Sequence, residues 1–294
     1  MHMQQHKGDM AVNIQTVGIV GAGTMGNGIA QACAVSGIHV VMVDISQAAV
    51  QKGLATVAGS LDRLIKKEKI TEADKQAALG RIQISTDYDA LQSAQLVIEA
   101  ATENYDLKVK ILQQLDAQLP AEALIATNTS SISITKLGAA TQRADRFIGM
   151  HFFNPVPMMA LVEIIRGLAT SDATHDAVKA LALQLGKTPI TVKNAPGFVV
   201  NRILVPMINE AFYVLSEGTA SAEDIDAGMK LGCNQPIGPL ALADMIGLDV
   251  CLAVMEVYLE EFGDSKYRPC YLLREMVAAG RLGRKTGQGV YSYQ

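Results

Sequence analysis

The sequence has little of several features that mark specialised classes of protein. Aromatic residues make up only 5% of its 294 residues, and the four cysteines, at 33, 233, 251 and 270, are widely scattered. Their spacing fits neither a zinc site nor a thioredoxin-like motif, which indicates a reducing compartment. No uninterrupted apolar run is long enough to span a bilayer. The formal net charge of −4 argues against general nucleic-acid binding, but it leaves room for a local basic patch that holds an anionic ligand.

The first ten residues, MHMQQHKGDM, also lack the apolar segment of a secretory signal peptide. We expect residues 1–13 to form a flexible leader, in which His2 and His6 bind no metal. The expected location of the protein is the cytoplasm. Hydrophobic residues make up 49% of the chain and charged residues 18%, which is ordinary for a globular protein. The length suits about two domains.

Short β-rich segments alternate with longer amphipathic segments up to about residue 193. The expected strands are 16–20, 39–44, 95–100, 123–128, 147–152, 161–166 and 189–193. Several of them are apolar at consecutive positions, as in strands that are buried on both faces. In 48–67 the apolar residues recur at spacings of three and four, which predicts a helix. This alternation predicts an α/β domain whose sheet is mostly parallel and covered by helices on both faces.

The pattern changes after the segment KNAPGF, residues 193–198. Helices are expected near 197–217, 222–231, 239–262 and 269–280, and no convincing strand precedes the tail. Ser221 and Asp224 have the spacing of a capping box at the start of the second helix. Pro196 and Gly197 mark the expected domain boundary. The sequence therefore predicts an α/β domain over residues 1–195, followed by a smaller all-α domain over residues 196–294.

The segment VGIVGAGTMGNGIA contains a G-x-G-x-x-G pattern, formed by Gly21, Gly23 and Gly26, between an apolar strand and a helix. Such glycines permit a tight turn, close approach of a pyrophosphate to the backbone, and close helix–strand packing. The free N–H groups and the dipole of the helix N-terminus favour the diphosphate. Thr24 and Met25 belong to the same binding loop. The pattern alone also occurs in turns without a ligand, but this context predicts a Rossmann-type domain that binds a dinucleotide.

Asp44 ends the second expected strand, near the spacing at which an acid accepts hydrogen bonds from the adenosine ribose. A carboxylate at this position repels a 2′-phosphate, and the following segment ISQAAV contains no arginine to bind one. The sequence therefore predicts NAD rather than NADP as the cofactor.

His151 is the strongest candidate for a proton-transfer group. It lies late in the expected strand FIGMHF, and ligands of open α/β sheets gather beyond the carboxyl ends of the strands. Pro155 and Pro157 predict a rigid, extended exit from this strand. The segment TNTSSIS, residues 127–133, offers hydroxyls and an amide at the same sheet edge. His39 enters its strand from the opposite end, so a structural role is expected for it.

Glu163 lies between Val162 and Ile164 on an expected strand, where a carboxylate needs a partner because burying an unpaired charge is costly. Pairing with His151 would orient the imidazole and stabilise its cation, much as the acid does in catalytic triads. Alternatively, Glu163 faces solvent on an edge strand and His151 is a hydrogen-bonded core residue. Composition and spacing alone leave both interpretations open.

Five segments together resemble the short-chain 3-hydroxyacyl-CoA dehydrogenase family, and within it the stand-alone 3-hydroxybutyryl-CoA dehydrogenases. These segments are GIVGAGTMGNGIAQ, NTSSISI, GMHFFNPVPMMALVEII, PGFVVNR and GPLALADMIGLD. The resemblance runs from about Gln15 to the C-terminus, and HFFNP with PGFVVNR is far more specific than the glycine loop. It implies NAD-dependent interconversion of (S)-3-hydroxyacyl-CoA and 3-oxoacyl-CoA, without a metal.

The resemblance also implies roles for individual residues. His151 matches the catalytic histidine and Glu163 its carboxylate partner. Ser130 matches the hydroxyl that binds the 3-oxygen of the substrate, and Asn201 matches an amide that positions the substrate. Further residues are implied in NAD binding, namely Glu103, Lys108 and Lys285, and Ser130 is implied there as well as at the substrate. Two residues on the helix over 48–67 are implied in coenzyme A binding, namely Ser60 and Lys67, although a solvated basic face would look the same.

A homodimer through the C-terminal helices is implied as well. This helical part has apolar residues that self-association would cover, namely Ile203, Leu204, Val205, Met207, Ile208 and Phe212. The alternative is that they pack against the first domain.

Two other functions stay open. A related dehydrogenase of a sugar acid, such as L-gulonate, could share the His–Glu pair but would not need the coenzyme A contacts. A non-catalytic NAD-binding protein would have no use for the set of Ser130, His151, Glu163 and Asn201. A reductase with a catalytic lysine is disfavoured, because the segment PGFVVN contains no counterpart of that lysine.

Overall fold

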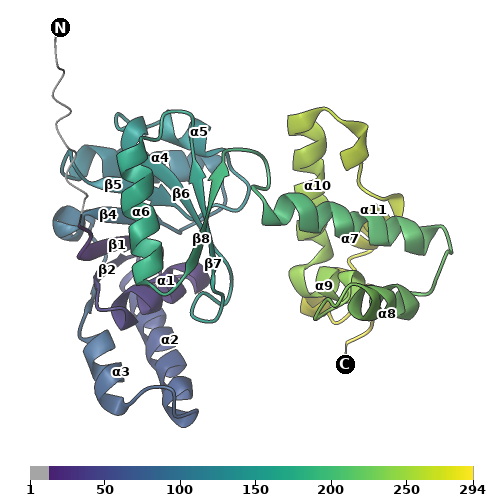
Figure 1. Cartoon of the computed structure of the whole chain (residues 1–294), viewed down its shortest axis with the longest axis horizontal. Coiled ribbons are helices and arrows are strands. Elements are labelled where there is room, and N and C mark those ends of the chain that lie inside the picture. Colours follow the sequence, from purple (N-terminus) through teal and green to yellow (C-terminus); the bar gives the residue numbers. More distant parts are fainter. Residues whose placement is uncertain (1–12, 294) are drawn as a thin grey trace, which may run out of the picture. The chain divides into compact units, whose positions relative to one another are not determined.

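The computed structural model describes residues 13–293, and the chain divides into two compact units at the bond between Ala195 and Pro196 (Figure 1). His2, His6 and nearly all of the expected leader lie outside the described residues. Among the residues that are described, no helix is long and apolar enough to cross a membrane.

The first unit is built on one eight-stranded sheet, with the strand order β3-β2-β1-β4-β5-β6-β7-β8. The strands are β1 Thr16–Val20, β2 His39–Val43, β3 Ile82–Ser85, β4 Leu96–Glu99, β5 Leu124–Thr127, β6 Phe147–Phe152, β7 Leu161–Arg166 and β8 Thr188–Lys193. Neighbouring strands are parallel except β6 and β7, which are antiparallel. The predicted mostly parallel α/β fold is therefore confirmed.

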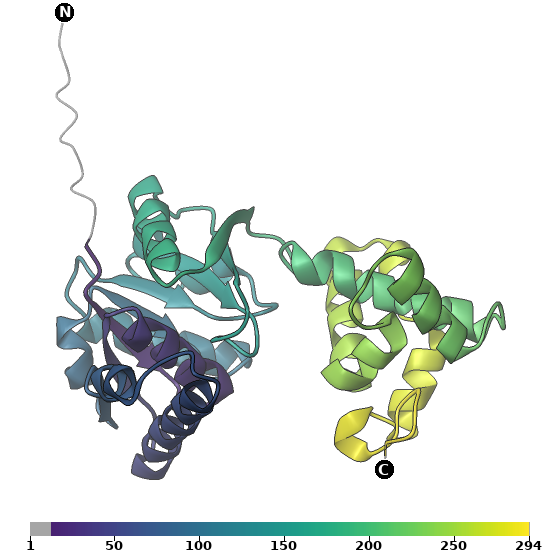
Figure 2. The same cartoon turned by 60° about the horizontal axis from the view of Figure 1, so that its bottom comes forward.

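Helices pack around this sheet (Figure 1, Figure 2). They are α1 Thr24–Val35, α2 Gln47–Lys66, α3 Glu72–Leu79, α4 Tyr105–Gln118, α5 Ile134–Gly138 and α6 Asp172–Gln184, with short 3₁₀ turns η1 Tyr88–Ser93 and η2 Ala144–Arg146. One core cluster joins residues of α1, α2 and α6, such as Ile29, Val57 and Val178, to the apolar side chains of the strands. All three of these side chains are at most 1% exposed.

Side-chain caps fix the start of most of these helices, and α1 differs from them. Ser46 caps α2, Thr71 forms a capping box on α3, and Asn104 caps α4, each by accepting a backbone N–H of the first turn. By contrast, α1 begins at Gly23 without a capping side chain and without an acidic residue in its first turn. Its first N–H groups are therefore not used by a cap, as an anion-binding helix start requires.

The second unit is helical, as predicted. It contains α7 Val200–Ser216, α8 Ala222–Gly232, α9 Pro239–Ile246, α10 Leu248–Phe262 and α11 Tyr271–Ala278, with 3₁₀ turns η3 Ser265–Tyr267 and η4 Arg284–Thr286. The predicted cap at Ser221 is present, because its hydroxyl accepts the Asp224 N–H at 3.1 Å. The single helix predicted over 239–262 is wrong. Gly247 has φ +108°, which interrupts the helix and separates α9 from α10.

Most of the apolar residues of α7 lie inside the helical unit itself. Ile208 and Phe212 are fully buried and pack with Leu240, and Val205 packs with Tyr258. Neither self-association nor packing against the first domain is needed to cover them, so that expectation was wrong for these residues. The prediction assumed that so small a domain could not bury them, but its five helices do. Leu204 and Met207 are half-buried, and Ile203 has 66% of its surface exposed.

Candidate active site

The glycine loop joins β1 to α1 in the conformation that its sequence predicts. Gly21 has φ +103°, and its N–H donates to the Val43 carbonyl at 2.8 Å. A Cβ on Gly26 would overlap the Gly21 carbonyl oxygen, so only glycine lets α1 start this close to the loop. No heavy atom lies within 4 Å of a Cβ built on Gly23. The backbone at Gly23 therefore faces open space, where a pyrophosphate fits.

Asp44 directly follows β2, at the position predicted to bind the ribose. It also contacts the glycine loop. Its carboxylate accepts the N–H of Ala22 and that of Ile45, both at 2.7 Å. A cavity of about 380 Å³ borders this carboxylate and is lined by Asp44, Ile45, Thr86, Asp87, Tyr88, Gln114 and Gln118. Ile45, beside this carboxylate, is 95% exposed and leaves an apolar side chain open at the cavity. Burial, with the charges of Glu99 and Asp44, raises the pKa of the Tyr88 phenol, which therefore stays protonated.

Lys108, predicted to contact NAD, lies on α4 and is buried, with only 1% of its surface exposed. Its Nζ lies 2.6 Å from the carboxylate of Glu99, which also accepts the Thr127 hydroxyl at 2.7 Å. The carboxylate of Glu103 is 3.9 Å away. The ammonium thus links α4 to β4 inside the unit, and its contact with NAD stays a prediction.

Glu103 organises the turn that follows β5. One of its carboxylate oxygens accepts the Thr129 hydroxyl at 2.6 Å and the backbone N–H groups of Ser130 and Ser131 at 2.8 and 3.1 Å. The Ser130 hydroxyl also donates to this oxygen at 3.1 Å. The hydroxyl predicted to bind the substrate is therefore oriented by a residue predicted to bind NAD.

His151 and Glu163 face each other across the antiparallel pair β6 and β7. His151 Nδ1 lies 2.7 Å from Glu163 Oε2, and both residues are buried, with 6% and 0% exposure. The alternative in which Glu163 faces solvent does not hold, because β7 lies between β6 and β8. The ring of Phe153 lies 4.5 Å from the His151 ring, centroid to centroid. Asn128 accepts the backbone N–H of Phe152 at 2.8 Å, which joins the ends of β5 and β6.

Two further histidines among the described residues of the first unit, His39 and His175, lie elsewhere. His39 begins β2 and is exposed, at the strand end opposite to the glycine loop. His175, on α6, has both ring nitrogens within hydrogen-bond distance of the unit's own side chains, Asp176 at 2.8 Å and Thr191 at 2.9 Å. Within residues 13–293, no group of three or more His, Cys, Asp or Glu side chains could hold a metal ion.

Asn201 and Lys285 belong to the second unit. Asn201 is half-buried in the first turn of α7, next to Arg202, whose guanidinium lies 3.6 Å above the Phe262 ring. Lys285 lies in η4, and its Nζ is 2.6 Å from both carboxylate oxygens of Asp249. Burial acts to raise the pKa of Asp249, but this ion pair and its hydrogen bonds lower it overall.

The two predicted coenzyme A contacts lie along α2 in the first unit. Ser60 is half-buried within the helix, and Lys67 is the exposed residue that follows its last turn.

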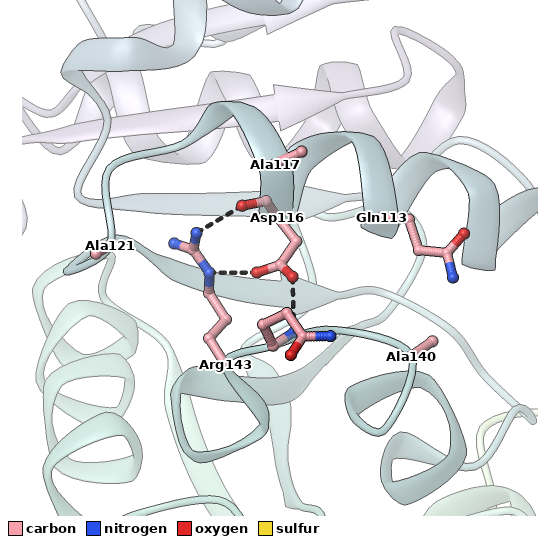
Figure 3. A pocket seen from close by; sticks show the side chains of 7 residues that line it. Gln113, Asp116, Ala117, Ala121, Ala140 and Arg143 are labelled. Atoms are coloured by element: carbon pink, nitrogen blue, oxygen red, sulfur yellow. Dashed lines mark hydrogen bonds and ion pairs between the residues drawn. The ribbon is translucent and has the colours of Figure 1, made fainter.

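Another cavity of the first unit, of about 470 Å³, lies beside the end of α4 (Figure 3). Arg143 donates from Nε to the Asp116 carboxylate at 2.6 Å and from Nη2 to the carbonyls of Asp116 and Leu119. These are the last carbonyls of α4, which have no partner within the helix. The Arg143–Asp116 pair therefore stabilises the end of α4. Because the two charges bind each other and the helix end, this cavity is a weak candidate for a ligand site.

Two family profiles match the chain, one for each unit. The NAD-binding domain of 3-hydroxyacyl-CoA dehydrogenases matches residues 16–195, and the C-terminal domain of the same enzymes matches residues 197–293. The chain belongs to the 3-hydroxyacyl-CoA dehydrogenase family. The resemblance seen in the sequence is thereby confirmed, and so is NAD as the cofactor.

Named relatives in this family cover nearly the whole chain. A 3-hydroxybutyryl-CoA dehydrogenase of Bradyrhizobium diazoefficiens is 53% identical over 285 residues, which are 97% of each chain. That of Clostridioides difficile is 48% identical over 94% of this chain and 98% of its own. The solved (S)-3-hydroxybutyryl-CoA dehydrogenase of Ralstonia eutropha is 76% identical, with a TM-score of 0.95, over 96% of this chain and 100% of its own.

Sequence reasoning missed several residues that shape the site of this family member. Glu99 ends β4 and carries the charge that holds Lys108, yet the segment QLVIEA predicts only a strand. Ile45 and Tyr88 line the cavity beside Asp44, but they come from separate loops. Glu99 could have been found, because a carboxylate in an otherwise apolar strand needs a partner, as at Glu163.

Proposed function

We propose that this protein is an NAD-dependent (S)-3-hydroxybutyryl-CoA dehydrogenase, which catalyses (S)-3-hydroxyacyl-CoA + NAD⁺ ⇌ 3-oxoacyl-CoA + NADH + H⁺. The observation that carries the proposal is the buried His151–Glu163 pair at the carboxyl end of β6. A buried histidine with a carboxylate on one ring nitrogen is suited to exchange a proton at the other. The named relatives support the substrate class and its handedness.

His151 moves the proton in this proposal. Neutral His151 donates its Nδ1–H to Glu163, so Nε2 is the nitrogen that accepts the hydroxyl proton during oxidation. During reduction, the imidazolium returns that proton from Nε2 to the carbonyl oxygen. Glu163 holds the ring in one orientation and stabilises its cation in both directions. The bound nicotinamide supplies the hydride acceptor or donor.

The first unit binds NAD in this proposal. The pyrophosphate lies against Gly23 and the uncapped first turn of α1, which includes Thr24 and Met25. Asp44 accepts hydrogen bonds from the ribose, and exposed Ile45 offers an apolar surface to the adenine. Glu103, Lys108 and Lys285 contribute further contacts to NAD.

Each unit contributes residues that contact the substrate in this proposal. Ser130 and Asn201 orient the 3-oxygen, and the Ser130 hydroxyl exchanges its bond to Glu103 for one to the substrate. Ser60 and Lys67 bind coenzyme A. The helical unit closes over the substrate and forms a homodimer. We also place the protein in the cytoplasm, since its four cysteines are free thiols.

One comparative assay tests this function. We expect NADH oxidation to be fastest with acetoacetyl-CoA, slower or equal with a longer 3-oxoacyl-CoA, and undetectable with an oxidised sugar acid. NADPH should give a higher Michaelis constant than NADH, because Asp44 repels the 2′-phosphate. Turnover of the sugar acid alone would reject the acyl-CoA assignment. Tight NADH binding without turnover of any of the three would reject the enzyme.

A further inference from the structure

Lys187 is a buried charged residue outside the groups named so far. It lies in the turn between α6 and β8, and only 8% of its surface is exposed. Its Nζ donates to the carbonyl oxygen of Val156 at 2.6 Å and to that of Met159 at 2.8 Å. Among residues 13–293, no carboxylate lies within ion-pair distance of this ammonium.

Burial of this ammonium without a counter-charge is costly for folding. Burial lowers the pKa of Lys187, and the one titratable group that acts on it is the Cys33 thiol. Burial in turn raises the pKa of Cys33 to about 12, so this thiol is uncharged at neutral pH. An apolar side chain of similar length would pack equally well at this position. What the ammonium adds is its two hydrogen bonds to carbonyl oxygens.

Those carbonyls belong to the connection between the strands of the catalytic pair. Residues 153–160 join β6, which carries His151, to β7, which carries Glu163. Within the connection, the Pro155 carbonyl accepts the N–H of Met158 at 2.9 Å and that of Met159 at 3.0 Å. This closes a turn, and two of its other carbonyls, those of Val156 and Met159, accept hydrogen bonds from Lys187.

The same turn is also pressed against α1. Val156 is 2% exposed, and a Cβ built on Gly28 of α1 would come within 2.9 Å of its Cβ. Directly after Lys187, the Thr188 N–H donates to the Ala160 carbonyl at 2.7 Å and starts the pairing of β8 with β7. The turn is therefore fixed between α1 on one side and the start of β8 on the other.

This turn connects the two strands, so its position bears on how Glu163 of β7 meets His151 of β6. In a tight two-residue hairpin the turn sets the strand register, whereas a connection as long as 153–160 needs further contacts to do so. Lys187 supplies two such contacts, both charge-assisted and therefore stronger than neutral hydrogen bonds.

We propose that Lys187 is a positioning residue of the active site, whose buried ammonium clamps the Val156–Met159 turn and thereby holds Glu163 against His151. This proposal rests on the proposed role of His151 as the proton carrier. Lys187 itself touches neither the substrate nor the cofactor in this proposal.

Replacement of the ammonium by an apolar side chain tests the clamp. We expect K187M to lower kcat for acetoacetyl-CoA reduction by about 10- to 100-fold, because a shift of about 1 Å in a catalytic group has such an effect. The Michaelis constant for NADH should stay within about twofold, since the glycine loop and Asp44 are unchanged. The melting temperature should stay close to that of the wild type, because losing a buried charge offsets losing its hydrogen bonds.

Three further variants complete the kinetic series. K187R keeps a cation with several donors and should recover most of the lost kcat. K179M removes an exposed lysine of α6, eight positions earlier in the chain, and should leave kcat unchanged. Should K187M give no folded protein, K187Q takes its place. Its amide is polar enough to be tolerated at this site, but it is shorter than lysine and uncharged, so it should not hold both carbonyls and kcat should still fall.

A double-mutant cycle with H151Q separates this proposal from the proposed function. If Lys187 acts through His151, K187M should slow H151Q no further. A multiplicative loss in the double variant would overturn the positioning role, and so would a K187M kcat within twofold of the wild type. A K187R kcat no better than that of K187M would also overturn it. Near-wild-type turnover of H151Q would instead reject the proton carrier itself.

Discussion

The proton-transfer chemistry depends on where each histidine lies in the fold and on the acid that orients its ring. At His151 the carboxylate of Glu163 takes Nδ1, and the ring sits at the carboxyl end of β6, where ligands of such sheets bind. At His175, which is equally buried and also has an acidic partner, Asp176 and Thr191 take both nitrogens. The two histidines are similarly buried, but only His151 lies at the strand end where ligands of such sheets bind, and this gives a matched test.

We predict that H151Q lowers kcat by about 10²–10⁴-fold, the usual contribution of positioned acid–base transfer, while the dissociation constant for NADH stays nearly unchanged. H175Q is the control. It should lower the melting temperature, because it breaks buried hydrogen bonds, yet keep kcat per folded molecule. Steady-state kinetics, NADH fluorescence titration and thermal melts measure the three quantities. A turnover of H151Q close to that of the wild type would remove His151 from the mechanism.

Composition and spacing were sufficient to nominate His151 and Glu163, but they left their pairing as one of two interpretations, and only the family resemblance implied the pair. Each stands out because a polar side chain interrupts an apolar strand near its ligand-binding end. Their pairing requires the register of β6 with β7, in which His151 lies opposite Glu163, and the sequence of the connection 153–160 does not reveal that register. The ion pair of Lys108 with Glu99 could not be predicted for the same reason, because it depends on how α4 packs relative to β4.

Two glycines of the glycine loop have different roles, one in packing and the other in ligand binding. Gly26 lies where α1 crosses the Gly21 carbonyl, so its missing side chain serves the packing of helix against loop. Gly23 has an ordinary φ of −66°, and its missing side chain leaves open space in front of the backbone. Packing therefore requires glycine at Gly26, whereas only a ligand could require it at Gly23.

We predict opposite results for alanine at these two positions. G26A should lower the free energy of unfolding by about 1–3 kcal/mol, the usual effect of overpacking. G23A should leave the melting temperature of the cofactor-free protein unchanged, yet raise the dissociation constant for NADH about tenfold or more, which corresponds to about 1.4 kcal/mol. Thermal melts and fluorescence titration of both variants test this. Unchanged NADH binding in G23A would mean that the pyrophosphate does not approach Gly23.

At the level of elements, prediction succeeded where one apolar segment makes a whole strand. The expected bounds of β1, β6 and β7 match those in the structure. The strand β3, Ile82–Ser85, was missed because it is a four-residue edge strand with alternating polar residues. The break at Gly247 was missed because a glycine within an apolar helical pattern is often tolerated.

At the scale of the whole molecule, the helical unit covers much of its own surface with its C-terminal segment. Asp244, 1% exposed, accepts the backbone N–H groups of Val290 and Tyr291 at 2.9 Å and the Tyr293 hydroxyl at 3.0 Å. Asp226 accepts the Tyr291 hydroxyl at 2.8 Å. The C-terminal segment is thus fastened onto α8 and α9, and the apolar surface that a second copy could cover is reduced to exposed side chains such as Ile203.

We predict that the purified protein is a homodimer, with a mass about twice the 31.3 kDa of one chain by light scattering. Ile203 lies 66% exposed on α7, so I203E should shift this mass toward the monomer by placing a charge in the covered surface. L183E is the matched control, because Leu183 is 58% exposed but lies on α6 of the first unit, and its mass should not change. A monomer mass for the wild type would reject the dimer, and a dimeric I203E variant would place the interface away from this residue.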